Sequence, residues 1–182
     1  IQQETLQKAL DLVAGVVPGK TTLPILTCVL MEADDQGLAF SATNLDISMV
    51  TRTSEVEVAK GGTAAVPSNK LVSFVRSLAP GVVKVTIESG KCTLRAGKAS
   101  FEEACMNAEE YPKLPDVAAG DGLEVAGGVL ADMIAATSYS VSRDETRPAL
   151  MGILWEVRQD GLTMVATDAH RLARCRRALD WS

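Results

Sequence analysis

An internal repeat constrains the fold of this 182-residue chain more than any other feature. Shifting the sequence by 124 positions aligns Leu23–Arg52 with Arg147–Arg176 without a gap. Self-similarity over such a length predicts two copies of one folded unit. The matched pairs include Leu6 and Leu130, Pro24 and Pro148, Leu26 and Leu150, Leu30 and Leu154, Glu32 and Glu156, Gly37 and Gly161, Leu38 and Leu162, Ala42 and Ala166, Thr43 and Thr167, and Arg52 and Arg176.

The two copies have unequal lengths. The first continues to about residue 118, whereas the second is followed only to Ser182. We therefore predict a complete domain over residues 1–118 and the first half of a second, truncated domain over residues 119–182. The segment Tyr111–Asp121, rich in Pro, Gly, Ala and Asp, is typical of a connector. Half a domain is expected to expose strand edges and an apolar face.

Hydrophobic periodicity predicts an α+β fold. Apolar residues at helical spacing indicate helices over residues 3–16 and 68–78, the second capped by Ser68 or Asn69. Strand patterns occupy residues 25–32, 38–42, 46–53, 55–59, 63–66, 83–87, 91–96 and 100–105. Helices are expected to pack on one side of antiparallel sheets. An unrelated α+β duplication would produce the same pattern.

Composition excludes several classes of protein. A net charge of −5 argues against a chain that grips nucleic acid with its whole surface, yet it permits a basic strip on one face. No apolar run reaches the roughly 18 residues of a membrane helix, and the opening residues do not resemble a signal peptide. The four cysteines form no Cys-x-x-Cys pair, so no zinc or redox motif is indicated and a reducing cytoplasm is expected.

Four motifs resemble the beta sliding clamp family, the beta subunits of bacterial DNA polymerase III. Each motif alone is modest, but together they follow the order of the family along the whole chain. On this basis the chain is identified as an N-terminal fragment of such a subunit. The motifs are Thr22-Leu23-Pro24-Ile25-Leu26, Tyr111-Pro112-Lys113-Leu114-Pro115, Asp144-Glu145-Thr146-Arg147-Pro148-Ala149-Leu150-Met151-Gly152, and Ala166-Thr167-Asp168-Ala169-His170-Arg171-Leu172-Ala173.

The resemblance implies a homodimeric ring. A family subunit has three such domains, and two subunits close head to tail, with helices lining the hole and sheets forming the outer wall. Such a ring encircles duplex DNA as a processivity factor in replication, and it needs neither a catalytic group nor a cofactor. This sequence departs from the family because it lacks counterparts of the rest of domain two, of domain three, and of the first residues of the opening strand.

Five basic residues are candidates for DNA contact at the helix-lined face. They are Lys8 on the first predicted helix, Lys20 in the loop after it, Lys70 and Arg76 on the second helix, and Arg143 in the equivalent loop of the second unit. Such residues would contact phosphates without reading base sequence. The resemblance carries a DNA contact over to Lys20, whereas its repeat-mate Asp144 is acidic. For Lys8, Lys70 and Arg76, ordinary solvated helix charge is the alternative.

The resemblance also implies a hydrophobic cleft that binds short linear motifs of polymerases, the clamp loader and repair proteins. An apolar pocket rimmed by a few polar groups suits an extended peptide. The alternative interpretation is that these residues belong to core strands. The cleft would comprise Leu150, Thr167, Ala169, His170, Arg171 and Leu172.

Two rival functions use the same residues differently. A protein-interaction module could share the fold without encircling DNA. A hydrolase could pair His170 with Asp168 and a serine, but the sequence has no Gly-x-Ser-x-Gly motif, and an Asp and a His two positions apart do not easily form the required relay. A metal site is not indicated, because a single histidine with scattered carboxylates lacks ligand spacing.

Overall fold

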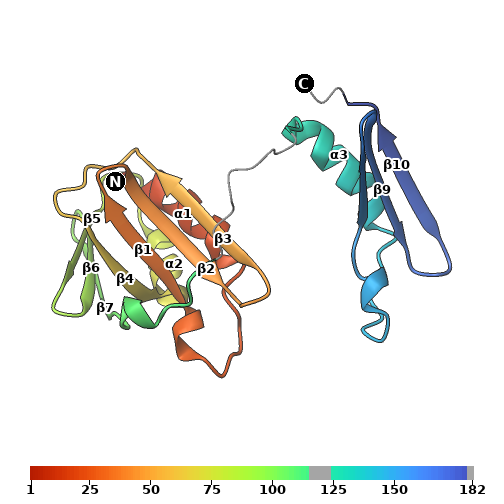
Figure 1. The fold of residues 1–182 in the computed structure, drawn as a ribbon. Coiled ribbons are helices and arrows are strands. Elements are labelled where there is room, and N and C mark those ends of the chain that lie inside the picture. Colours follow the sequence, from red (N-terminus) through yellow and green to blue (C-terminus); the bar gives the residue numbers. More distant parts are fainter. Residues whose placement is uncertain (115–123, 180–182) are drawn as a thin grey trace. The chain divides into compact units, whose positions relative to one another are not determined.

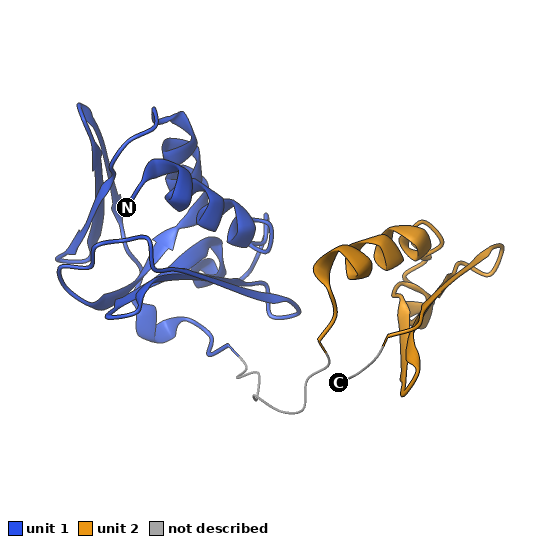
Figure 2. Ribbon diagram, turned by 90° about the horizontal axis from the view of Figure 1, so that it is seen from above, with its two compact units in different colours: residues 1–116 blue, residues 117–182 orange. Residues whose placement is uncertain are grey.

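The structure, a computed structural model, describes residues 1–114 and 124–179 and divides into two compact units. Unit 1 comprises Ile1–Asp116 and unit 2 comprises Val117–Ser182 (Figure 2). The boundary predicted between residues 118 and 119 lies outside the described residues. No helix in the described ranges is long and apolar enough to cross a membrane.

Unit 1 contains two antiparallel sheets. The larger sheet has the order β3-β2-β1-β4, and the smaller has the order β5-β6-β7. Isolated bridges from Gln2 to Val82 and from Ala65 to Met106 extend these pairings. The elements are η1 (Pro24–Thr27), β1 (Cys28–Asp34), β2 (Gly37–Thr43), β3 (Ser48–Thr53), β4 (Gly62–Pro67), β5 (Lys84–Glu88), β6 (Lys91–Ala96), β7 (Ala99–Ala104) and η2 (Ala108–Glu110).

Two helices, α1 (Gln3–Ala14) and α2 (Ser68–Ser77), pack on one face of the larger sheet (Figure 1). Leu6, Leu10 and Val13 of α1 are fully or almost fully buried because their spacing puts them in one stripe. Together with Leu71 and Val75 of α2, they form the core against the sheet. The exposed residues of α1 include Glu4 and Lys8 but also the apolar Leu12, which is 57% exposed.

Unit 2 repeats the first half of this arrangement. Its strands are ordered β10-β9-β8, and Met133, Leu162 and Met164 fill its core. When shifted by 124 positions, the bounds of α1, β2 and β3 coincide with those of α3, β9 and β10. The predicted repeat is therefore confirmed as a repeat of structure. The elements are α3 (Gly127–Ser138), η3 (Pro148–Leu150), β8 (Leu154–Arg158), β9 (Gly161–Thr167) and β10 (Leu172–Arg177).

Gly37 and Gly161 show how closely the copies agree. Their φ angles are 127° and 145°, in a region that L side chains rarely adopt. A Cβ at Gly37 would lie 2.2 Å from the carbonyl oxygen of Thr53, and one at Gly161 would lie 2.1 Å from that of Arg177. The matched glycines are therefore required by one shared hairpin geometry.

Three local predictions were wrong. Residues 25–27, expected to begin the strand over residues 25–32, lie in the 3-10 helix η1, and β1 starts only at Cys28. Residues 55–59 alternate like a strand but form none, because β3 and β4 occupy opposite edges of the larger sheet and the chain must cross between them. The alternation reflects packing instead, since Val56 rests against the core. Helix α2 begins at Ser68 with Pro67 at the N-cap position and has no side-chain cap hydrogen bond.

Strand β8 of unit 2 is exposed along its whole length. Leu154, Trp155 and Val157 are 64%, 47% and 50% exposed, whereas Met31, the repeat-mate of Trp155, is only 2% exposed. In unit 1, β1 pairs with both β2 and β4, but among the described residues of unit 2, β8 pairs with β9 alone. Within the described residues of unit 2, β8 therefore has one unpaired edge and carries exposed apolar side chains.

Candidate nucleic-acid and peptide interfaces

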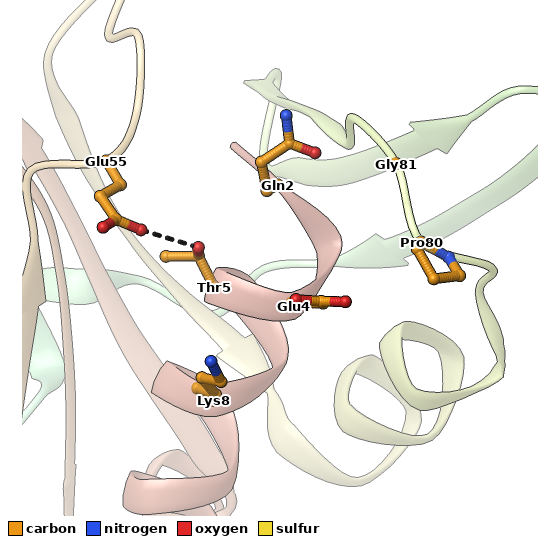
Figure 3. Close-up of a pocket in the computed structure, with 7 residues that line it drawn as sticks. All are labelled: Gln2, Glu4, Thr5, Lys8, Glu55, Pro80 and Gly81. Atoms are coloured by element: carbon orange, nitrogen blue, oxygen red, sulfur yellow. Dashed lines mark hydrogen bonds between the residues drawn. The ribbon is translucent and has the colours of Figure 1, made fainter.

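Lys8 lies beside a polar pocket at the start of α1. The pocket encloses about 380 Å³ and is lined by Gln2, Glu4, Thr5, Lys8, Glu55, Pro80 and Gly81. Thr5 donates a hydrogen bond to Glu55 through Oγ1 at 3.0 Å. Lys8 therefore shares its surroundings with the carboxylates of Glu4 and Glu55, as Figure 3 shows.

Lys70 and Arg76 both form ion pairs. Nζ of Lys70 lies 3.0 Å from Oε2 of Glu103 on β7. Nη2 of Arg76 lies 2.7 Å from Oδ1 of Asp11 on α1. Both cations are more than half exposed, so these are surface pairs, and each acid offsets the charge that a phosphate would meet.

Lys20 and Arg143 lie in the loops that follow α1 and α3. Both are exposed, and neither forms an ion pair within residues 1–114 and 124–179. Next to Arg143, Asp144 accepts hydrogen bonds from the backbone N–H and the hydroxyl of Thr146, and these hold the pKa of its carboxyl below the ordinary value. Asp144 is thus ionised at neutral pH, and its hydrogen bonds to Thr146 stabilise the turn that contains both residues.

Helix α3 of unit 2 carries no positively charged residue. Residues 127–138 include no Lys or Arg, and Asp132 is their one charged residue. Positive charge near α3 therefore comes from other segments of unit 2, such as the loop that carries Arg143, rather than from the helix itself.

Four of the predicted cleft residues lie, together with Asp168, in one tight turn between β9 and β10: Thr167, Ala169, His170 and Arg171. Oγ1 of Thr167 donates to the carbonyl oxygen of Arg171 at 2.7 Å. The backbone N–H groups of His170 and Arg171 donate to Oδ1 of Asp168 at 3.0 and 2.9 Å. The pKa of the Asp168 carboxyl is held below its ordinary value by these two N–H groups. The larger effect comes from the N–H of Arg171 and the smaller from that of His170.

The turn has a copy in unit 1. Thr43 donates to the carbonyl of Ile47 at 3.1 Å, and Asn44 accepts from the N–H groups of residues 46 and 47. Leu45 and Ala169, which are repeat-mates, have φ angles of 79° and 76°. The two turns therefore share one backbone conformation and differ in the side chains that they carry.

Arg171 links the turn to the end of α3. Its Nε donates to Oδ2 of Asp168 at 2.9 Å, and its guanidinium lies 5.9 Å from the ring centroid of Tyr139. Sequence reasoning missed Tyr139, which is 60% exposed. Comparison of the two repeats could have identified Tyr139, because this aromatic residue aligns with Gly15, the C-cap of α1.

The two predicted apolar cleft residues lie on different elements. Leu172 begins β10 and is 65% exposed, so it is not a core residue. Leu150 ends η3 and is half-buried, with its carbonyl oxygen accepting from the N–H of Ser142 at 2.9 Å. Met151, beside Leu150, is a further exposed apolar side chain that the sequence did not single out.

The hydrolase arrangement is not formed. Asp168 uses Oδ1 on the backbone N–H groups of His170 and Arg171, and Oδ2 on the Arg171 side chain. It therefore does not orient the imidazole of His170, which is exposed. Across the part of the chain that the structure describes, no group of three or more His, Cys, Asp or Glu residues is placed to hold a metal ion.

Family models match both units. The model of the DNA polymerase III beta subunit N-terminal domain matches residues 1–115, and that of its central domain matches residues 124–181. The chain belongs to the DNA polymerase III beta subunit family. The resemblance seen in the four motifs is therefore confirmed.

Members of the beta subunit family from several bacteria are similar to the chain. The Beta sliding clamp of Pseudomonas aeruginosa is 35% identical over 176 residues, which cover 96% of this chain and 48% of that protein. The Beta sliding clamp of Bacillus subtilis is 31% identical, with 99% and 50% covered. That of Escherichia coli K12 is 32% identical, with 96% and 48% covered. The chain spans about half the length of the curated relatives it matches.

Solved structures of beta subunits show the same fold. The sliding clamp from Bacillus subtilis matches with a TM-score of 0.92 at 31% identity, covering 99% of this chain and 50% of that chain. The Pseudomonas aeruginosa clamp bound to griselimycin matches with a TM-score of 0.92 at 34% identity, covering 98% and 49%. The predicted α+β clamp fold is confirmed.

Proposed function

We propose that the protein acts as a DNA sliding clamp, a non-catalytic ring that encircles duplex DNA in the cytoplasm and tethers the replicative polymerase. Membership of the beta subunit family carries this proposal. The architecture agrees with it, since α1 and α2 cover one face of the sheet in a unit that is then repeated. A repeated unit with all its helices on one face is suited to line a hole with helices.

The charges on the helix side suit sliding. Phosphate contacts bind DNA of any sequence, and their strength grows with the number of uncompensated cations. Here Lys70 and Arg76 are paired with acids, and Lys8 shares a pocket with two carboxylates. Lys20 in unit 1 and Arg143 in unit 2, each exposed in the loop after its helix, then supply most of the attraction to phosphates within their own units. Such a surface holds DNA weakly enough to move along it.

We further propose that the turn at residues 167–172, with Leu150, binds linear peptide motifs of polymerases, the clamp loader and repair proteins. Exposed Leu172 offers an apolar contact, while His170 and Arg171 offer polar groups at its rim. The turn is stiffened by five internal hydrogen bonds between Thr167, Asp168, His170 and Arg171. A rigid surface loses little conformational entropy when it binds an extended peptide.

Topological retention tests the clamp proposal. The homodimeric protein would be loaded by a clamp loader onto a nicked circular plasmid and passed through a gel-filtration column at high salt. A ring stays with the circle, because salt does not open it, and leaves once a single restriction cut provides an end. Equal loss from circular and linear DNA at high salt would contradict encirclement.

Peptide titration tests the docking proposal. Replacing Leu150 and Leu172 by alanine should weaken the binding of clamp-binding peptides by about tenfold or more, because burying a leucine stabilises a complex by roughly 1.5–3 kcal/mol. Leu45→Ala, in the matching turn of unit 1, is the control and should leave peptide affinity unchanged. Unchanged affinity in the Leu150 and Leu172 variants would place the peptide elsewhere.

A further inference from the structure

The ion pair between Arg76 and Asp11 connects α2 to α1 on the side away from the core. Nε and Nη2 of Arg76 both donate to Oδ1 of Asp11, at 2.9 and 2.7 Å. The side chains of Arg76 and Asp11 are 57% and 36% exposed. Solvent can reach the Arg76 guanidinium, so a phosphate can reach it too. Any phosphate that binds there meets a guanidinium that is already paired with the Asp11 carboxylate.

Other charged side chains on α1 and α2 lie near residues of opposite charge. Glu4 and Lys8 lie one helical turn apart on α1 and line one pocket, and Lys70 is paired with Glu103. The Arg76–Asp11 pair is the one of these interactions that joins α1 to α2 through charged side chains. If this face contacts DNA, the Asp11 carboxylate determines how much of the positive charge of Arg76 is available to a phosphate.

We infer that Asp11 sets the strength of the contact between this face and DNA by competing with phosphate for Arg76. This inference rests on the proposed function. Each phosphate that a protein neutralises releases counterions and makes binding more salt-dependent. Because the guanidinium is already compensated by Asp11, binding of a phosphate at Arg76 releases fewer ions and gains less affinity. Asp11 thereby favours a mobile complex over a tight one.

A purely structural role for Asp11 would give different results. The pair could serve only to fasten α1 to α2, but these helices have another link, in which Nε2 of buried Gln3 donates to the carbonyl oxygen of Val75 at 2.8 Å. Leu10 and Val75 also share the core. Asp11→Asn, nearly identical in shape, should therefore remain folded, which a thermal melt would check.

The experiment measures duplex binding by the 182-residue chain and its variants. Fluorescence anisotropy of a labelled duplex of about 20 base pairs would be recorded between about 50 and 200 mM salt. Asp11→Asn should raise affinity about two- to fivefold, the range expected for an exposed ion pair. Its plot of log affinity against log salt should steepen by about 0.9, the contribution of one phosphate.

Three further variants make the result specific to the pair. Arg76→Ala in the Asp11→Asn background should remove the whole gain, whereas Arg76→Ala alone should change affinity little. Glu88→Gln removes the same charge from exposed β5 and should leave the salt slope unchanged. An equal gain from Glu88→Gln and Asp11→Asn would overturn the inference in favour of a general charge effect.

Lys20→Ala separates this inference from the proposed function. If Lys20→Ala weakens binding while Asp11→Asn changes neither affinity nor salt slope, DNA binding stands and the role of Asp11 is refuted. If the chain and all its variants fail to bind duplex even at the lowest salt, the role of Asp11 is refuted, while the clamp proposal is decided separately by retention on circular DNA. A gain in Asp11→Asn that depends on Arg76 supports both.

Discussion

Replacement of Gly161 by alanine should destabilise unit 2 through a single backbone contact. The φ angle of Gly161 is 145°, and a Cβ there would lie 2.1 Å from the carbonyl oxygen of Arg177. Real Cβ contacts below 3.0 Å essentially do not occur, so the end of β10 or the start of β9 must shift by about 1 Å. Conformational strain of this kind costs about 1–3 kcal/mol by itself. We expect a loss of at least about 2 kcal/mol.

Urea denaturation followed by tryptophan fluorescence is the appropriate assay. Both tryptophans, Trp155 and Trp181, belong to unit 2, so fluorescence reports that unit while far-ultraviolet circular dichroism reports both. For a small unit with an m-value near 1 kcal/mol/M, the expected loss lowers the urea midpoint by about 2 M. Unit 2 of the variant is therefore expected to unfold at low urea or to be unfolded in water.

Gly152→Ala is the matched control in unit 2. A Cβ at Gly152 meets nothing within 4 Å, so stability should stay within about 0.5 kcal/mol of the original. Gly37→Ala, the repeat-mate substitution, should leave the fluorescence transition unchanged and lower only the dichroism transition of unit 1. Equal midpoints for Gly161→Ala and Gly152→Ala would refute the reasoning from hairpin geometry.

Three further outcomes are expected. Burial, and to a lesser extent Cys105, raises the pKa of the Cys92 thiol to about 12, so a thiol reagent at pH 8 should label Cys92 only after unfolding; rapid labelling of the native chain would contradict its burial. The pKa of Asp168 is lowered in the folded state, so its turn is stabilised above the unfolded pKa of about 3.9 and loses that stabilisation as the pH falls through the folded pKa. Nuclear magnetic resonance should show the amide of His170 titrating together with Asp168. Gly128→Ala in α3 has open space for its Cβ and should stabilise unit 2 by up to about 1 kcal/mol, which would raise the fluorescence midpoint in urea.

The repeat and most elements of the fold could be predicted from local patterns. Helical spacing of Leu6, Leu10 and Val13 identified α1, and the matched Gly37 and Gly161 marked both hairpins, because these signals depend only on residues near each other in the chain. The segment 55–59 was wrongly predicted as a strand. Alternation of apolar and polar residues indicates which side chains are buried, but it does not show whether a neighbouring strand is available for pairing. The order β3-β2-β1-β4 leaves it none.

The candidate site divides in the same way. Sequence placed Lys70 and Arg76 on the second helix, because their positions depend on the pattern of that single element. It did not reveal that Arg76 meets Asp11 or that Lys70 meets Glu103, since the partners are separated by 65 and 33 residues. Those contacts depend on how α1, α2 and β7 are placed against the sheets. The sequence alone therefore determined where positive charge occurs, and the packing of distant elements decided how much of it remains available to a phosphate.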